Sequence, residues 1–393
     1  MHDATVTVSG AAVTPFNRRR DGTGLRDWAA SAFDAALAMS DLHRGDIDAL
    51  YVASESDFFH LQLNPASVLA TELGLAGVSA TRCEGGGASG QLAVHAALRA
   101  VQSGAARHVA VVGVDPSASS LPGDDIRTLY GFSFDAWTDG MTGLTSTALY
   151  ALSYQAFTES HTVSDSDLAT VTIQNRSNAC HNPGAHLGRT DSAEDIANSP
   201  VIAHPYRRLH CSPLSDGAAA LILSDTSHLP TTRKSAPRVV GAGAATDHMH
   251  LGARAKPGLF SAKTRAMQRA CAEADVTPSA VNYAEIYDAY AGAQLQGIAA
   301  LGLSGDVIRD LRAGRFAPNG ACPINLSGGL MGQGAPVGAT GVAQTATCAL
   351  ILEGRYHPDL QPQTLPQIAL ADTHGGICTT SAVTLLAQGA RAA

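Results

Sequence analysis

The chain has 393 residues, enough for two core-forming units of roughly 100–200 residues each. Its 45% hydrophobic residues, 15% charged residues and 39 glycines are typical of an α/β protein with close helix–sheet packing and exclude a disordered chain. The net charge of −8, without a basic stripe, argues against nucleic-acid binding. No apolar run of ~18 residues and no charged-then-apolar leader are present, so we expect no membrane span and no secretion signal. Seven scattered cysteines without CxxC pairs indicate reduced thiols, a cytoplasmic location and no metal site.

The first part of the chain predicts alternating strands and helices. In chain order we expect a strand at 5–11, a helix at 25–39, a strand at 47–53, a helix at 61–73, a glycine-rich elbow at 81–90, a helix at 91–104 and a buried strand at 107–115. The elbow reads Thr-Arg-Cys-Glu-Gly-Gly-Gly-Ala-Ser-Gly. Because it opens directly into a helix, it presents bare backbone N–H groups that stabilise an oxyanion or hold a thioester carbonyl.

The second half repeats this order. The matching elements are a strand at 238–243, a helix at 262–274, a strand at 281–288, a glycine-rich elbow at 328–341, a helix at 342–353 and a strand at 367–372. The repeat predicts two similar half-domains, with both elbow helices central and buried. Between the halves, residues 116 to about 230 form a polar insert that contains a helix at 145–157 and ends in another buried strand. A long connection with its own elements usually covers a site.

Four segments then give the chain a recognisable pattern. They are the elbow Glu84–Gly90, the stretch Cys211–Ala220 (CSPLSDGAAA), the stretch Glu285–Ala291 (EIYDAYA), and Asn325–Gly329 running on to Gly341. With them the whole chain resembles the thiolase superfamily, and within it the sterol-carrier-protein type of thiolases and lipid-transfer proteins.

The resemblance implies a thiolase fold, with duplicated βα half-domains in a five-layered αβαβα arrangement and an inserted loop domain. It divides the chain into an N-terminal half (1–115 plus about 200–235), a loop domain over the substrate (116–199) and a C-terminal half (236–393). It further implies a dimer formed through the N-terminal halves and an acyl-CoA substrate. Coenzyme A would then be part of the substrate, and no tightly bound cofactor is expected.

Two family positions are changed in this chain. In members that catalyse Claisen chemistry, a nucleophilic cysteine precedes Ala-Ser-Gly in the first elbow, and that position is Gly87 here. A histidine that follows the glycine of the second elbow is replaced by Ala335. No acyl-enzyme can form at Gly87, and Cys83, at the end of a strand, is either a substitute nucleophile or an inert core residue. We expect Gly87, Ala88, Gly334 and Ala335 to form an oxyanion and substrate pocket, which the missing side chains enlarge for a bulky acyl chain.

Several other residues remain candidates for the chemistry. His374, in a loop after the last predicted strand, is either a general base or a loop histidine bonded to backbone. Cys378 is the alternative thiolase base or a packing residue. Tyr287 and Asp288 end a strand where the family has histidine or asparagine beside an acidic residue, and a phenol next to a carboxylate can act as acid or base. Tyr287 can equally serve only in packing.

Three functions are compatible with this pattern. Elbows of this kind, without a cysteine before Ala-Ser-Gly, resemble those of aldolases that cleave 3-hydroxyacyl-CoA. That reaction needs a base and an oxyanion hole but no acyl-enzyme. Such aldolases work with a small OB-fold partner that carries a zinc-binding segment, so we expect a homodimer or a heteromer with such a protein. An acyl-CoA acyltransferase with a relocated nucleophile is the second hypothesis. A non-catalytic subunit that pairs with an active thiolase is the third.

Overall fold

The computed structural model describes residues 4–19 and 21–389, and the outermost residues of the two expected halves lie outside this range. The strands are β1 (Val6–Val13), β2 (Ala49–Ala53), β3 (Ser79–Cys83), β4 (His108–Pro116), β5 (Val201–Ala203), β6 (Tyr206–Arg207), β7 (Asp216–Asp225), β8 (Arg238–Thr246), β9 (Tyr283–Glu285), β10 (Ile368–Gly375) and β11 (Thr380–Ala387). The α-helices are α1 (Leu25–Ser40), α2 (Pro65–Glu72), α3 (Ser89–Gln102), α4 (Gly123–Tyr130), α5 (Ser146–Thr158), α6 (Asp165–Cys180), α7 (Ala193–Asn198), α8 (Ser261–Ala274), α9 (Ala291–Ala300), α10 (Val307–Arg312), α11 (Gly329–Gly332) and α12 (Val337–Leu352).

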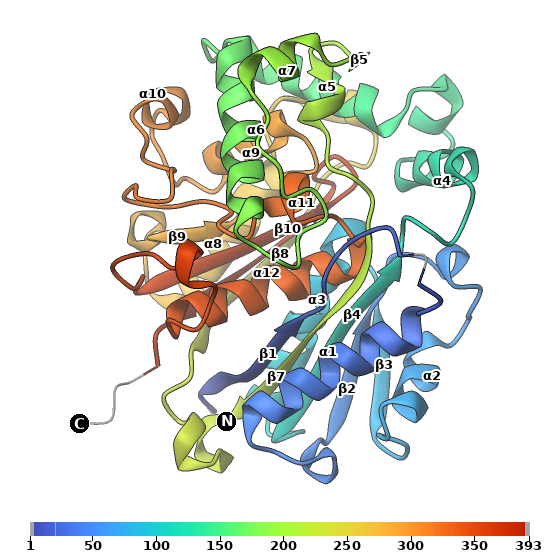
Figure 1. Cartoon of the computed structure of the whole chain (residues 1–393), viewed down its shortest axis with the longest axis vertical. Helices are drawn as coiled ribbons and strands as arrows, with labels where there is room; N and C mark the ends of the chain where they lie inside the picture. The colour runs from blue at the N-terminus through green and yellow to red at the C-terminus, as the bar shows by residue number, and fades with distance from the viewer. Residues whose placement is uncertain (1–3, 20, 390–393) are drawn as a thin grey trace.

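The two halves of the chain share a continuous sheet with the order β3-β2-β4-β7-β1-β8-β11-β10-β9 (Figure 1). They join where β1 pairs with β8, through only two residue pairs, Val6 with Val239 and Thr7 with Arg238. In the first half β2 runs parallel to both β3 and β4, and in the second half β9 runs parallel to β10. This repeated order confirms the predicted duplication.

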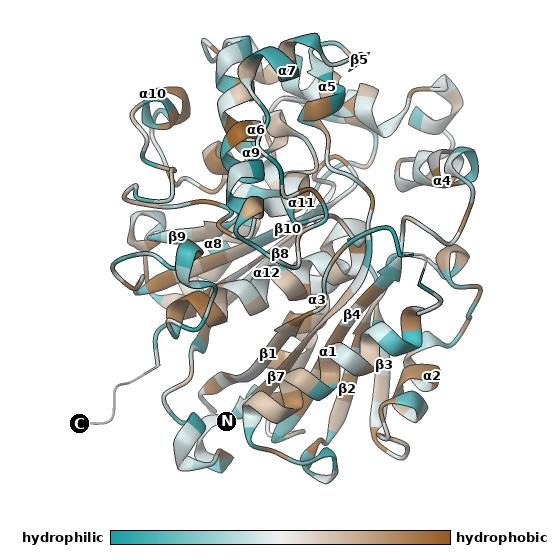
Figure 2. Cartoon of the chain, viewed as in Figure 1, coloured by the Kyte–Doolittle hydropathy of each residue, from teal (hydrophilic) through white to brown (hydrophobic). Residues whose placement is uncertain are grey.

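Three apolar cores divide the molecule into layers. One core packs α1 and α2 against the outer face of the first-half strands, and a second holds α3 and α12 between the strands of both halves. A third packs α8 and α9 against the other face of the second-half strands. Figure 2 shows β2, β4 and β7 as largely apolar, as strands covered on both faces must be. The five-layered thiolase fold that the resemblance implies is therefore confirmed.

Glycines allow the two central helices to approach closely. A Cβ at Gly90 of α3 would lie 2.8 Å from the Cα of Gly341 in α12, and a Cβ at Gly341 would lie 2.6 Å from the backbone nitrogen of Gln91. Real Cβ atoms do not make such contacts, so these positions admit only glycine without a shift of backbone. The crossing positions the amino ends of both helices in the centre of the molecule.

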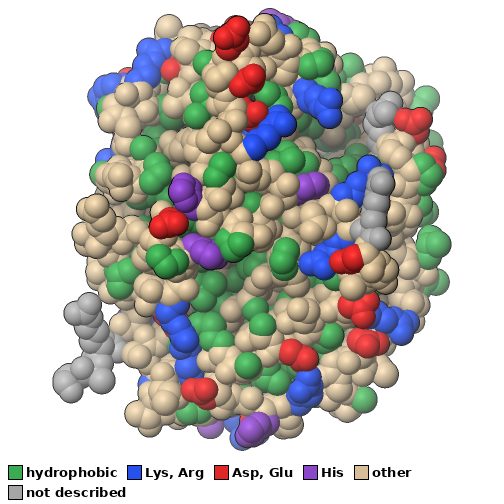
Figure 3. Space-filling model, viewed as in Figure 1, with side chains coloured by type: hydrophobic (Ala, Val, Ile, Leu, Met, Phe, Trp, Pro, Cys, Tyr) green, Lys and Arg blue, Asp and Glu red, His purple; other side chains and the backbone are tan. Residues whose placement is uncertain are grey.

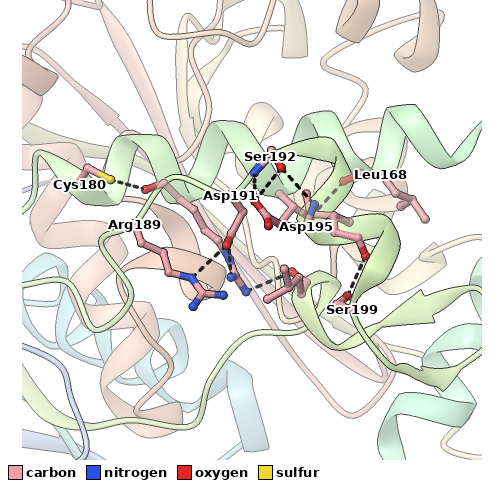
Figure 4. Close-up of polar contacts among 11 residues, drawn as sticks. Leu168, Cys180, Arg189, Asp191, Ser192, Asp195 and Ser199 are labelled. Carbon is pink, nitrogen blue, oxygen red and sulfur yellow. Dashed lines mark hydrogen bonds and ion pairs between the residues drawn. The ribbon is translucent and has the colours of Figure 1, made fainter.

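The insert is a folded unit, held partly by a buried ion pair. The Arg176 guanidinium of α6 contacts the Asp191 carboxylate at 2.6 Å, and both side chains are almost fully buried. Arg189 contacts the other oxygen of Asp191 at 3.0 Å, and Ser192 caps α7 through the backbone N–H of Asp195 (Figure 4). The predicted helix at 145–157 is α5, and the predicted last strand of the insert is β7.

Three predicted boundaries were wrong for local reasons. Helix α2 begins at Pro65 instead of residue 61, because proline favours the first helical position and Leu61 has a positive φ of 50°. Strand β9 has only three residues, whereas β10 continues to Gly375 because β11 pairs with it as far as Thr380. His374 thus lies within a strand and not in a loop.

The surface shows no concentration of one charge on the face drawn in Figure 3, where acidic and basic side chains are interspersed. Among the described residues, no helix is both long and apolar enough to cross a membrane.

Candidate active site

The candidate site lies where the carboxyl ends of parallel strands from both halves meet. In the first half, Glu55 follows β2, the elbow with Gly87 follows β3, and Asp115 stands near the end of β4. In the second half, Tyr287 follows β9 and His374 lies at the end of β10. Because the carboxyl ends of neighbouring parallel strands share one edge of a sheet, residues distant in sequence gather here.

A cavity of about 400 Å³ occupies this position. Gly87, Tyr287, Ala335 and His374, all expected at the site from the sequence, line it together. The insert contributes another wall, including Tyr150 of α5. The insert therefore forms part of the wall of this cavity.

Tyr287 fills the space that a side chain at Gly87 would need. Its hydroxyl oxygen lies 2.4 Å from the position of a Cβ at Gly87, and the carbonyl oxygen of His374 lies 2.3 Å from the same point. The expectation of an enlarged pocket at Gly87 was therefore wrong, because a phenol from the other half of the chain and a backbone carbonyl take the space. Burial raises the pKa of Tyr287 above its ordinary value, so the phenol keeps its proton at neutral pH.

The hydrogen bonds of His374 determine its tautomer. The Tyr150 hydroxyl lies 2.8 Å from Nε2 of His374 and 2.6 Å from the carbonyl oxygen of Gly376. Its single proton goes to the carbonyl, so Nε2 of His374 carries a proton and donates it to the Tyr150 oxygen. Nδ1 then has a free lone pair, and this buried atom has no hydrogen-bond partner among the described residues.

Burial and two nearby positive charges keep His374 neutral. Burial, followed by the positive charges of Lys263 and Arg254, holds the pKa of His374 well below its usual range. Lys263 is fully buried and forms an ion pair with Asp372, which also accepts the backbone N–H of Tyr287 at 3.3 Å. The ring centroids of Tyr287 and His374 lie 4.5 Å apart. The buried Lys263–Asp372 pair thus contacts the backbone of Tyr287 and helps to lower the pKa of His374.

The two elbows differ in the backbone donors that they offer. The Gly87 N–H, at the wall of the cavity, has no acceptor among the described residues. At the second elbow the N–H of Gly338 donates to Asp115 Oδ2 at 2.6 Å, and that of Val337 donates to Ser117 Oγ at 3.3 Å. The first elbow can therefore receive a substrate oxygen, whereas the amino end of α12 is already occupied by a carboxylate.

The remaining predicted residues lie beside the cavity without lining it. Asp288 is fully buried and accepts the backbone N–H groups of Leu330 and Met331 at the start of α11. Cys378 is buried, and burial raises the pKa of its thiol to about 11. Ala88 and Gly334 are the chain neighbours of Gly87 and Ala335, outside the wall itself.

Sequence reasoning missed Glu55 and Tyr150. Glu55 lines the cavity, and its position after a buried strand, at the same edge as the elbow, is a signal that was available. Tyr150 lies on a correctly predicted helix, but nothing in the local sequence indicates that its hydroxyl reaches His374.

Comparison with known proteins agrees with this fold. The N-terminal domain of thiolases matches residues 6–189, and the thiolase C-terminal domain-like family matches residues 243–388. An acetyl-CoA acetyltransferase of Methanothermobacter thermautotrophicus is 30% identical over 352 residues, 89% of this chain and 91% of that protein. The chain belongs to the thiolase superfamily, in its sterol-carrier-protein-type branch.

Two further proteins are similar to this chain over most of its length. The 17-hydroxy-3-oxo-4-pregnene-20-carboxyl-CoA lyase of Mycobacterium tuberculosis is 26% identical over 365 residues, 88% of this chain and 91% of that protein. Among solved structures, the Ltp2-ChsH2(DUF35) aldolase superposes with a TM-score of 0.83 and 22% identity, covering 100% of both chains. At that identity the superposition shows the fold alone.

Proposed function

We propose that this protein breaks or forms a carbon–carbon bond of the aldol type in a 3-hydroxyacyl-CoA, without an acyl-enzyme. The observation that carries the proposal is the replacement of a nucleophile at Gly87 by the phenol of Tyr287, which closes the space a reactive thiol would occupy. Retro-aldol cleavage needs only a base, hydrogen-bond donors and a proton source. The cavity wall contains each of these groups.

His374 is the proposed base. Its Nδ1 lone pair is free and its ring is neutral, so it can accept the proton of the 3-hydroxyl group as the bond between C2 and C3 breaks. Tyr150 holds the ring in the required tautomer through Nε2. Tyr287 O–H and Gly87 N–H are the proposed donors to the thioester oxygen, which gains negative charge as the enolate forms.

The relatives support both sides of the choice between cleavage and acyl transfer. The lyase of Mycobacterium tuberculosis favours cleavage, whereas the acetyltransferase of Methanothermobacter favours acyl transfer. The positions of the cysteines support the proposal of cleavage, because none of the seven lines the cavity. Cys83 and Cys378 also have thiol pKa values raised by burial, which opposes formation of a nucleophilic thiolate.

A protein partner is part of the proposal, either a second copy of the chain or a small OB-fold zinc-containing protein. Phe58 and Phe132, both 64% exposed, border a second cavity of about 600 Å³ next to the elbow. Trp137 and Met141, which follow in the same part of the insert, are 88% and 77% exposed. Large apolar side chains exposed together favour a protein interface.

The test is a mass-resolved incubation with 3-hydroxyacyl-CoA and 3-ketoacyl-CoA esters, for the chain alone and with its co-purified partner. We expect acyl-CoA and carbonyl products from the hydroxy esters, no thiolysis with added CoA, and no covalent mass gain. Replacement of His374 by Gln should abolish cleavage and leave folding intact. Thiolysis or an acyl adduct would establish the acyltransferase, and no turnover in any combination would establish a non-catalytic subunit.

A further inference from the structure

Glu55 is the acidic side chain at the wall of the reaction cavity, and the chemistry above leaves it unused. It follows β2 and borders both this cavity and the second cavity beside the elbow. Its buried Oε2 atom has no hydrogen-bond partner among the described residues. A buried carboxyl oxygen without a partner is costly, and its presence at a cavity wall points to a role toward the ligand.

The neighbours of Glu55 favour the protonated carboxyl. Asp115 collects the local donors: the backbone N–H groups of Glu55 at 3.0 Å and Gly338 at 2.6 Å, and the Ser54 hydroxyl at 2.9 Å. The negative charge is therefore held on Asp115. Burial and the Asp115 charge raise the pKa of Glu55 to about 8; the Tyr130 hydroxyl opposes this rise, and Glu84 of the elbow adds to it.

The groups that face Glu55 come from four parts of the fold. Asp115 lies on β4, Glu84 on the elbow, Tyr130 at the end of α4, and Tyr287 after β9. No cation contributes to the pKa shift of Glu55, and both phenols are held protonated by burial. Glu55 is therefore an acid with a proton to give near neutral pH, and it lines the same cavity as His374 of β10.

We propose that Glu55 is the general acid–base at C2 of the acyl-CoA, delivering its carboxyl proton to the carbon on which the enolate forms. The assignment rests on the proposed function. When His374 takes the 3-hydroxyl proton, the electron pair of the C2–C3 bond moves to C2 and the carbonyl product forms. Glu55 then donates its proton to C2, giving the acyl-CoA and a Glu55 carboxylate. Water carries the proton from His374 back to Glu55, which restores both groups.

Acetyl-CoA in D₂O tests this step separately from cleavage. The Glu55 carboxylate should remove a C2 proton and return a deuteron, so the wild-type chain should exchange the acetyl hydrogens, detected as a mass gain. Replacement Glu55→Gln should lower exchange and cleavage by ~100-fold or more, the usual size of a general acid–base contribution. The dissociation constant for acetyl-CoA should change less than about threefold, since an amide keeps the size of the side chain. Glu72→Gln, on the exposed surface of α2, is the matched control and should exchange like the wild type.

The pH profiles add a readout that a structural role would not produce. Exchange of acetyl-CoA should rise as the pH passes about 8, because removal of the C2 proton needs the carboxylate, whereas cleavage should fall over the same range. Wild-type rates in Glu55→Gln, or a loss explained by lost acetyl-CoA binding, would overturn the assignment. If Glu55→Gln fails to fold, two other measurements test the assignment. They are the wild-type pH profiles of exchange and cleavage, which should run in opposite directions, and the rates of Glu55→Asp. Glu55-dependent exchange without cleavage of any hydroxy ester would reject the proposed function but retain Glu55 as the C2 base, whereas cleavage that survives in Glu55→Gln would reject Glu55 alone.

Discussion

The hydroxyl oxygen of Tyr287 lies 2.4 Å from the point where a Cβ would stand at Gly87. The two residues are 200 positions apart and belong to different halves of the duplicated fold. The space that a side chain at Gly87 would need is thus filled by the phenol of Tyr287. The site therefore differs from a nucleophilic thiolase site because a phenol lies where the reactive thiol would stand, and the space is not left empty.

Tyr287→Phe should lower cleavage by ~100-fold or more, the scale for loss of one preorganised oxyanion donor. The ring still fills the space beside Gly87 and packs on His374, so stability should change little. Steady-state rates and the midpoint of urea unfolding measure the two effects. Full activity in the variant would remove Tyr287 from the mechanism.

Gly87→Ala should destabilise the fold by ~1–3 kcal/mol, the usual cost of overpacking. The new Cβ would meet the His374 carbonyl oxygen at 2.3 Å, and a backbone atom of β10, which is paired on both sides, cannot move away as a side chain can. Gly45→Ala is the control, because no atom lies within 4 Å of its Cβ position. Urea unfolding of the two variants should differ clearly. Equal stability of the two variants would mean that the segments carrying Tyr287 and His374 shift at little cost to accommodate the new Cβ.

Stability should fall as the pH rises through the range in which buried Glu55 loses its proton. Its pKa is raised from 4.5 to about 8, so between these values the folded chain binds a proton that the unfolded chain has lost. The contribution is fully present below pH 4.5 and is lost as the pH passes 8. Between pH 7 and 9 this group alone should lower the free energy of unfolding by ~1 kcal/mol. Across this range the urea midpoint should fall less steeply with pH in Glu55→Gln than in the wild type. The same pH dependence in both would contradict a buried proton on Glu55.

Lys263→Met should cost ~3–5 kcal/mol, because it leaves the fully buried Asp372 carboxylate without its cation. The double variant Lys263→Met with Asp372→Asn removes both charges and should recover part of the loss. A double-mutant cycle from urea unfolding gives the coupling. The single variant should also raise the pKa of His374, since Lys263 helps to lower it. Additive effects of the two changes would show that the ion pair contributes nothing.

Much of the fold was predictable because its signals are local. Apolar periodicity placed α1 and α8 almost to the residue, and the repeated order of elements revealed the duplication. The elbow motif identified Gly87, the family resemblance at the end of a predicted strand identified Tyr287, and a position after another predicted strand identified His374. The short β9 and the late start of α2 were missed, because pairing partners and a proline decide them more than apolar pattern does.

The sequence by itself determined the family, the two half-domains, the loss of a nucleophile at Gly87 and two of the candidate acids and bases, Tyr287 and His374. Only the tertiary structure decided how these groups work together. It placed Tyr287 against Gly87, closed the amino end of α12 with Asp115, and directed Tyr150 to the ring of His374. It also brought Glu55 to the cavity wall, where burial and the Asp115 charge raise its pKa to about 8. The reason is physical: a motif is written in neighbouring residues, whereas contact, burial and pKa depend on which distant strands end at the same edge of the sheet.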